Sequence, residues 1–375
     1  MLKTSTDPIR HALNGPTMGT HWSALFYAEQ GLDPAPVQAA LQSAVDMVDA
    51  EMSVWKADSD LMRLNRAPLG AWIEVAAGLA EVLDLGSGVG RASGGAFDIG
   101  MGDVARAWGF GPDEANANAI HEALVAARRP AHKALEIDRA AGRARKHAPI
   151  TLDLNGIAKG YGVDKLAETL RGFGIAASLV GIDGEMRALG LRPDGRPWAI
   201  AVEAPDPERR APHSVLMLEN AAVATSGDYR HHVTVQGLRL SHTMDPATGG
   251  PLCSPPASVT VVARNCAEAD AWASALMVLG PKAGGELAAR LGLDALFLMR
   301  EAGGIRSHAI GALFAARAAP PSIIPLSLDA LSVHARVPCR FRQYLCEDGH
   351  LTLVSCPMAF SDRPSRPGPI QKRRR

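Results

Sequence analysis

The sequence predicts an α+β protein, and two features of the chain indicate this class. Before residue 100, two stretches carry apolar positions at helical spacing. From Ile150 onward, short β-rich runs alternate with turn residues and are interrupted by two further helical stretches. Helices followed by a mixture of strands and helices argue against a regular βαβ alternation. A chain of 375 residues can bury a sizeable core as one large domain or two ordinary ones.

The first predicted elements are helices. Residues 36–51 (PVQAALQSAVDMVDAE) have apolar positions at helical spacing, and Pro36 suits a first turn. Residues 75–91 form the next predicted helix. Its second half contains Gly86, Gly88 and Gly90. Each glycine costs a helix interior about 1 kcal/mol relative to alanine, so this segment carries a local conflict.

The predicted strands lie mostly between residues 150 and 263. They are ITLDL, AASLV, WAIAVE, SVLMLE and SVTVVA, which are separated by clusters of Gly, Pro, Asn and Asp. Helices predicted over residues 161–171 and 267–279 interrupt them. MGTHW, at residues 18–22, is typical of the start of another strand.

Beyond about Leu313 the apolar pattern breaks down, and we expect weak order in an unassigned extension over residues 315–375. Five side chains there are of zinc-binding types: Cys339, Cys346, Cys356, His334 and His350. Their spacing fits no common zinc-finger pattern, which favours scattered thiols over a zinc site. The terminal KRRR is interpreted as a solvated basic end rather than a nucleic-acid or membrane contact.

Composition excludes several classes of function. The 39 basic and 39 acidic residues cancel, so the excess of positive charge that nucleic-acid binding requires is absent. The longest apolar run, ASALMVLG, is far shorter than the roughly 20 residues that span a bilayer. The N-terminus lacks the apolar segment of a signal peptide, so we expect a cytoplasmic protein, or a periplasmic one if an export signal precedes this sequence.

Two glycine-rich segments invite comparison with phosphate-binding loops. GSGVGRASGG, at residues 86–95, follows a helical stretch rather than a strand, which excludes a Rossmann fingerprint. DLNGIAKGYGVDKL, at residues 153–166, combines a strand, glycines, Lys159 and a helix start. Such an arrangement can bind phosphate through backbone groups and one ammonium, and a tight turn with a solvated lysine is an equally good interpretation.

Two polar groups elsewhere are candidates for chemistry. Asp270 and Ser274 are four residues apart on a predicted helix and therefore share a face. Their oxygens suit Mg²⁺, although Asp270 alone could simply favour the helix dipole. SHTMDPATGG, at residues 241–250, is a turn-rich segment that contains His242, and it is either an ordinary polar loop or one that presents an imidazole.

Taken in order, nine segments resemble the ApbE family of FAD:protein FMN transferases, from about Asn14 to about Phe314. They are MGT, MSVWKADSDLMRLN, SGGAFDIG, WGFG, DLNGIAKGYGVD, SLVGIDGEMRALG, TSGDY, SHTMDPATG and ADAWASALMVLG. The resemblance implies one domain over residues 14–314, with two interleaved lobes and FAD in the cleft between them. It also implies Mg²⁺-dependent transfer of FMN from FAD to a Thr or Ser hydroxyl of an acceptor flavoprotein, with release of AMP.

Site residues follow from the same resemblance. The metal ligands would be the backbone carbonyl of Gly156 and the side chains of Asp270 and Ser274, where the family more often has Thr at position 274. His242 would be the general base, a role that suits a neutral imidazole near pH 7. The flavin and its phosphates would lie against Met18, Trp55, Ala96, Phe97, Asp98, Asp153, Lys159 and Met244.

Two alternatives to this function stay open. An FAD pyrophosphatase would use the same metal and base, with water in place of the acceptor hydroxyl. A flavin carrier would bind FAD without chemistry, and it would not need His242, Asp270 and Ser274 as a set. The chain departs from the family at Asp183, where Gly is usual, and this could alter the backbone path beside the site.

Overall fold

The computed structural model describes residues 7–206, 209, 211–228, 232–235, 238–253, 255–301, 303–315, 342–347 and 350–355. Contacts divide the chain into two units, Met1–Pro321 and Ser322–Arg375. In the second unit, β18 (Arg342–Glu347) pairs with β19 (His350–Ser355) as an antiparallel hairpin. The rest of the predicted extension, with Cys339, Cys356 and His334 of the zinc candidate, lies outside the described residues.

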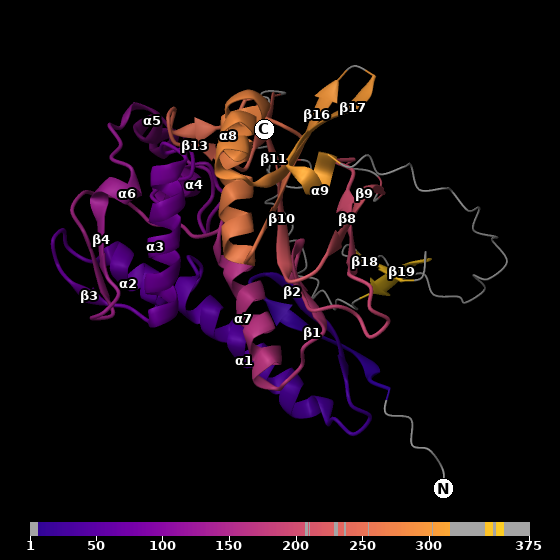
Figure 1. Ribbon diagram of the computed structural model, residues 1–375. Coiled ribbons are helices and arrows are strands. Elements are labelled where there is room, and N and C mark those ends of the chain that lie inside the picture. Colours follow the sequence, from indigo (N-terminus) through magenta and orange to yellow (C-terminus); the bar gives the residue numbers. More distant parts are fainter. Residues whose placement is uncertain are drawn as a thin grey trace, which may run out of the picture. The chain divides into compact units, whose positions relative to one another are not determined.

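An eight-stranded antiparallel sheet organises the first unit, with the order β1-β2-β6-β7-β10-β15-β16-β17 (Figure 1). The strands are β1 (Ile9–Thr17), β2 (Thr20–Ala28), β6 (Ser178–Ile182), β7 (Glu185–Leu189), β10 (Ala221–Gly227), β15 (Ser258–Ala263), β16 (Asp294–Glu301) and β17 (Gly304–Ile310). Five of the six residues of β15 are buried, because this strand pairs on both sides and is covered by a helix.

Three long helices pack at this sheet (Figure 1). They are α1 (Pro34–Met52), α7 (Ala158–Gly172) and α8 (Cys266–Leu291). Helix α8 contacts β10 and β15, α7 contacts β6 and β7, and α1 contacts α7 and β1. Trp22 and Phe26 of β2 are buried with Leu41 of α1 and Leu166 of α7 in one apolar cluster. The sequence therefore correctly predicted the amphipathic helices that close this core.

A second group of elements lies on the other side of α8, which contacts α3 (Figure 1). It contains α2 (Asp60–Arg66), α3 (Ala77–Ala92), α4 (Gly102–Ala107), α5 (Ala117–Val125) and α6 (Ala131–Ala134), with a small sheet of β3 (Ile73–Glu74), β5 (Arg143–Lys146) and β4 (Leu135–Asp138). One apolar cluster joins Leu83 of α3 to Leu276 of α8. Helix α8 thus contributes to the packing of both groups.

Short elements complete the first unit. They are the hairpin of β8 (Trp198–Glu203) with β9 (Pro212–Leu218), the hairpin of β11 (His232–Val235) with β12 (Leu238–Ser241), the pair β13 (Met244–Asp245) and β14 (Gly250–Pro251), and α9 (Ala312–Ala315). Trp198 of β8 lies 5.9 Å from the ring of Tyr27. Among the described helices, none has the length and apolar character to span a membrane.

Two of the three glycines in the second half of α3 have a packing role, whereas Gly88 has open space around it. A Cβ at Gly86 would lie 2.9 Å from Cγ2 of Ile99, and one at Gly90 would lie 2.9 Å from the carbonyl oxygen of Phe97. The helix therefore uses glycine so that the segment carrying Phe97 and Ile99 can approach it closely. The helical propensity lost at these positions is offset by this packing.

Two predictions of secondary structure need correction. ITLDL is not a strand: only Thr151 makes an isolated bridge, to Met101, while the N–H groups of Leu152 and Asp153 bond to Asn65 Oδ1 and Ile99 O. Its backbone groups are satisfied by a side chain and a loop instead of a sheet. The helix predicted to end at 279 breaks at Gly280 (φ 72°), before Pro281, and then continues to Leu291 as a second segment.

Candidate functional site

Helix α8 presents the acidic side of the site. Asn265 caps its N-terminus by accepting a hydrogen bond from the Glu268 N–H (2.8 Å). One turn further, Asp270 is only 5% exposed and its Oδ2 accepts from the Gly160 N–H at 3.1 Å. Asp270 is thereby fixed to the start of α7, the element that follows the glycine-bearing loop.

The structure brings together the residues predicted to bind the metal. A Cβ placed on Gly156 would lie 3.1 Å from Ser274 Oγ and 3.2 Å from Cε2 of Phe97. Ser274 is one turn beyond Asp270 on α8, and glycine at 156 allows the loop to approach its hydroxyl. No group of three or more His, Cys, Asp or Glu side chains suited to a metal occurs among the described residues. One carboxylate, one hydroxyl and a carbonyl fit Mg²⁺, which normally keeps several of its waters.

Lys159 lies in a cluster with three carboxylates. Its Nζ is 2.7 Å from Glu185 Oε1 and 3.6 Å from Asp183 Oδ2. Burial alone would lower the pKa of Lys159, but Glu185, Asp183 and Asp270 outweigh burial and raise it. Burial also raises the pKa of Glu185, against the opposing effect of Lys159. The ammonium therefore stays charged throughout the physiological range.

The cluster carries excess negative charge. Burial, followed by the Glu185 carboxylate, raises the pKa of Asp270 to about 7, although Lys159 acts in the opposite direction. Glu185 is 3% exposed, and its Oε2 has no hydrogen-bond partner among the described residues. One ammonium cannot neutralise three buried or half-buried carboxylates, so a divalent cation at this position would be favourable electrostatically.

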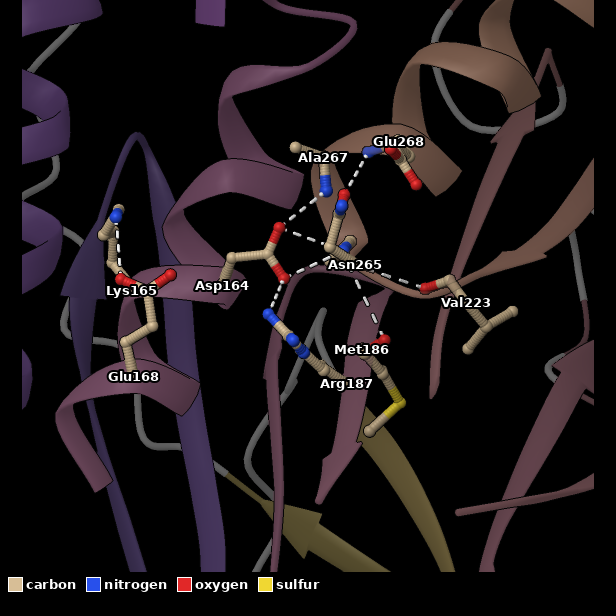
Figure 2. Close-up of polar contacts among 10 residues, drawn as sticks. Asp164, Lys165, Glu168, Met186, Arg187, Val223, Asn265, Ala267 and Glu268 are labelled. Carbon is tan, nitrogen blue, oxygen red and sulfur yellow. Dashed lines mark hydrogen bonds and ion pairs between the residues drawn. The ribbon is translucent and has the colours of Figure 1, made fainter. Parts of the chain in front are cut away.

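Another buried carboxylate, that of Asp164, fixes the start of α8 (Figure 2). Asp164 of α7 accepts from the N–H groups of Cys266 (2.8 Å) and Ala267 (2.9 Å) and pairs with Arg187 Nη1 of β7 at 2.6 Å. Burial raises the pKa of Asp164, and Arg187 opposes that rise. One side chain thus joins α7, β7 and the first turn of the helix that carries Asp270.

Two of the predicted flavin residues, Asp98 and Asp153, make hydrogen bonds to the backbone of their own loops. Asp98 Oδ1 accepts from the N–H groups of Gly100 (2.8 Å) and Ala131 (3.0 Å), and Asp153 Oδ1 accepts from the Asn155 N–H (2.8 Å). Burial raises the pKa of both carboxyl groups. Phe97 is buried and Ala96 half-buried. The two Asp side chains therefore shape these loops, and their contact with FAD stays a prediction.

Met18 occupies a strained position. It forms the turn between β1 and β2 with Gly19, and both residues have positive φ (45° and 72°). Two positive φ angles are what a tight hairpin turn needs, but a methionine there costs conformational energy. Its Cε would lie 3.3 Å from a Cβ on Gly162 in α7. The hairpin turn accounts for this conformation, and the contact of Met18 with the flavin stays a prediction.

Asp183 also has a positive φ, of 57°, between β6 and β7. This is the left-handed conformation that glycine adopts without penalty. The backbone at this position thus keeps a path suited to glycine, and the difference from the family pattern is the added carboxylate beside Lys159.

Three of the residues predicted for the site lie on segments other than α7, α8 and the loop that carries Gly156. Trp55, beyond the end of α1, is 65% exposed. Met244 is buried with Met101 and Val104 in a small apolar cluster. His242 follows β12, and its ring lies edge-on to Phe110 with 6.4 Å between centroids. The approach of these three residues to Asp270 and Ser274 stays a prediction.

The loop that holds His242 is an ordered turn. Asp245 accepts through Oδ1 from the Ala247 N–H (2.9 Å) and through Oδ2 from the Thr248 hydroxyl (3.1 Å). Its carbonyl accepts from the Gly249 N–H, and Gly249 has φ 69°. Asp245 therefore orders this turn through both its side chain and its carbonyl.

Sequence reasoning missed three side chains of this region. Glu185 and Asp164 are buried carboxylates, and Ser226 places its hydroxyl 3.1 Å from that of Ser274. A signal for Glu185 was a charged residue beside the apolar run of β6, in a segment that also carries Asp183 and Arg187. Ser226 lies in TSGDY, a segment that contributed to the resemblance without a role of its own.

Comparison with known proteins identifies relatives of this chain. The model of the ApbE family matches residues 18–297. A relative from Salmonella typhimurium named FAD:protein FMN transferase is 33% identical over 311 residues, which cover 81% of this chain and 88% of the relative. One of the same name from Klebsiella pneumoniae is 32% identical over 300 residues, covering 79% and 86%.

Solved structures give the same result. The flavin transferase ApbE from Vibrio cholerae is 31% identical with a TM-score of 0.72, covering 81% of this chain and 97% of the other. The flavinyl transferase ApbE from Pseudomonas stutzeri is 34% identical with a TM-score of 0.73, covering 83% and 98%. The chain thus has the α+β fold of solved flavin transferases. It belongs to the ApbE family.

Proposed function

We propose that this chain is a Mg²⁺-dependent FAD:protein FMN transferase. As in the relatives that bear this name, it transfers flavin from FAD to a target protein. The acceptor group is a Thr or Ser hydroxyl of a flavoprotein, the product bond is a phosphoester, and AMP leaves. The observation that carries the proposal is the convergence of Gly156, Asp270 and Ser274 beside Lys159.

The reaction displaces AMP from the FMN phosphorus of FAD. The acceptor oxygen forms a bond to that phosphorus, the pyrophosphate P–O bond breaks, and AMP takes the bonding electrons. His242 accepts the hydroxyl proton, a role that requires a neutral imidazole. Such displacements depend mainly on positioning and on neutralisation of charge at the phosphates.

Different residues of the site would bind the phosphates, the metal ion and the flavin. Lys159, kept charged by its carboxylate neighbours, would face the phosphates of FAD. Asp270, Ser274 and the Gly156 carbonyl would hold Mg²⁺, which supplies positive charge to the pyrophosphate oxygens when bound. Met18, Trp55, Ala96, Phe97, Asp98, Asp153 and Met244 would contact the flavin nucleotide, in the cleft expected between the lobes.

Intact-mass analysis tests the transfer. A flavoprotein with a Thr or Ser acceptor site is incubated with this enzyme, FAD and Mg²⁺, with EDTA and acceptor-free controls. A mass gain of one FMN that EDTA abolishes is expected. Release of FMN and AMP without labelling would favour FAD pyrophosphatase, and FAD that stays intact but bound would favour a flavin carrier.

His242→Ala tests the proposed base. The variant should bind FAD as the native protein does but should not label the acceptor, because the attacking hydroxyl keeps its proton. FAD affinity is measured by fluorescence and labelling by intact mass. Transfer at the normal rate would mean that another group removes the proton.

A further inference from the structure

The hydroxyl of Ser226 meets that of Ser274 across the interface between β10 and α8. The two Oγ atoms are 3.1 Å apart, and both residues are half-buried. Ser226 is the last residue but one of β10, a strand that α8 packs against directly. The neighbouring Thr225 bonds instead to Thr260 of β15 (2.9 Å), as expected because successive strand residues face opposite sides of a sheet.

A serine side chain within a helix adopts a single rotamer only if another group holds its hydroxyl. Its hydroxyl can rotate, and it can also turn back to the carbonyl four residues earlier, which here belongs to Asp270. The bond to Ser226 holds the Ser274 hydroxyl on the side where Gly156 approaches. Ser226 thereby selects the rotamer that faces the loop.

The O–H group of Ser274 also needs a hydrogen-bond acceptor. A hydroxyl that binds a cation does so through an oxygen lone pair, so its O–H must donate to another acceptor. Ser226 Oγ is at donor–acceptor distance and can accept that proton while donating its own elsewhere. With this bond in place, a Ser274 lone pair is directed away from β10.

We infer that Ser226 is a positioning residue, which fixes the rotamer and proton of Ser274 so that Ser274 Oγ can serve as a cation ligand. The inference rests on the proposed function, because it assumes the Gly156–Asp270–Ser274 site. Thr at position 274 would have fewer χ1 rotamers in a helix than Ser, so its orientation would depend less on the hydrogen bond to Ser226.

Binding of Mn²⁺ to the apoprotein tests the inference without any turnover. Free aqueous Mn²⁺ is measured by electron paramagnetic resonance, and the oxygen ligands proposed here accept this ion as well as Mg²⁺. The proteins compared are the native chain, Ser226→Ala, Ser274→Thr, the double variant and Asp270→Asn. Thr225→Val is the matched control, since it removes the hydroxyl that bonds to Thr260, from the same strand but at the other face of the sheet.

Ser226→Ala should weaken Mn²⁺ binding about fivefold, the effect of one net hydrogen bond. In the Ser274→Thr background the same change should weaken binding by less than about twofold, because the β-branched side chain has only two χ1 rotamers in a helix and therefore less freedom to lose. Thr225→Val should leave the dissociation constant unchanged. Melting temperatures in EDTA confirm that each variant is folded.

Three results would overturn the inference, and they separate it from the proposed function. If Ser226→Ala binds Mn²⁺ normally while Asp270→Asn loses binding, the metal site stands and Ser226 has no positioning role. If Ser226→Ala costs the same in both backgrounds, it does not act through the Ser274 rotamer. If Asp270→Asn binds Mn²⁺ normally, the metal site itself is wrong and the inference fails with it.

Discussion

Asp164→Ala should destabilise the protein strongly without touching a proposed ligand. The substitution removes the acceptor of two N–H groups at the start of α8 and leaves Arg187, whose side chain is 13% exposed, without its 2.6 Å partner. Breaking a buried ion pair from one side costs about 3–5 kcal/mol. The two orphaned N–H groups act in the same direction. We therefore expect the free energy of unfolding to fall by about 3–5 kcal/mol.

Urea unfolding followed by circular dichroism measures this change. The matched control is Lys165→Ala, which removes an i,i+3 pair with Glu168 from the same helix, where the side chains are 25% and 52% exposed (Figure 2). A partly exposed pair of this kind contributes about 0–1 kcal/mol, and the contact of Lys165 Nζ with the Tyr161 ring (4.7 Å to the centroid) adds about 0.5–1 kcal/mol. If both variants lose the same stability, the buried network around Asp164 does not hold α7 to α8.

Three further predictions concern the cluster and the helix that faces it. Gly160→Ala should destabilise the protein by at least about 1–3 kcal/mol in urea unfolding, because the added Cβ would lie 2.3 Å from the Cys266 carbonyl oxygen. The control, Gly172→Ala, has open space around the added Cβ and should be neutral or stabilising. Asp183→Asn should tighten FAD binding about threefold at low salt, measured by fluorescence, because it removes a charge that competes for Lys159. Asp270→Asn should gain stability relative to the native protein as pH rises from about 4 to 7, measured in EDTA. Native Asp270, whose pKa is raised from 3.8 to about 7, keeps a proton that the unfolded chain releases in this window, so the native protein loses stability there while Asn does not titrate.

Each of these predictions has a clear contrary result. Equal stability of the Gly160 and Gly172 variants would mean that α7 and α8 have room to separate. Unchanged or weaker FAD binding by Asp183→Asn, or a gain that persists at high salt, would mean that Asp183 does not compete electrostatically. A stability difference for Asp270→Asn that is constant with pH would place the native Asp270 pKa near its ordinary range.

Local patterns in the sequence were sufficient for the elements with strong periodicity. The helices predicted at 36–51 and 161–171 are α1 and the larger part of α7, and SVTVVA is β15. ITLDL has the composition of a strand, but the side chain of Asn65 takes one of its N–H groups, a long-range contact that composition does not encode. β16 and β17 were not predicted, although they complete the sheet edge.

The residues of the site likewise fall into those with a local sequence signal and those brought in by long-range strand pairing. The i,i+4 spacing of Asp270 and Ser274 and the glycine at 156 are local signals, and the fold places them together. Glu185 and Ser226 reach the same region from β7 and β10, through strand pairings that join distant segments. Their involvement becomes visible only when the sheet order is known.

The break at Gly280 divides α8 into a first segment, which carries Asp270 and Ser274, and a second segment over residues 281–291. At Gly280 the backbone leaves the helical conformation and Pro281 cannot donate a hydrogen bond, so the ladder of the first segment ends there. Strain or displacement in residues 281–291 is therefore not passed along a continuous rod to Asp270 and Ser274. The second segment still packs in the core through Leu287 and Ala288, so its exposed positions, such as Lys282, Glu286 and Arg290, are the ones suited to engineering without disturbing the oxygen ligands.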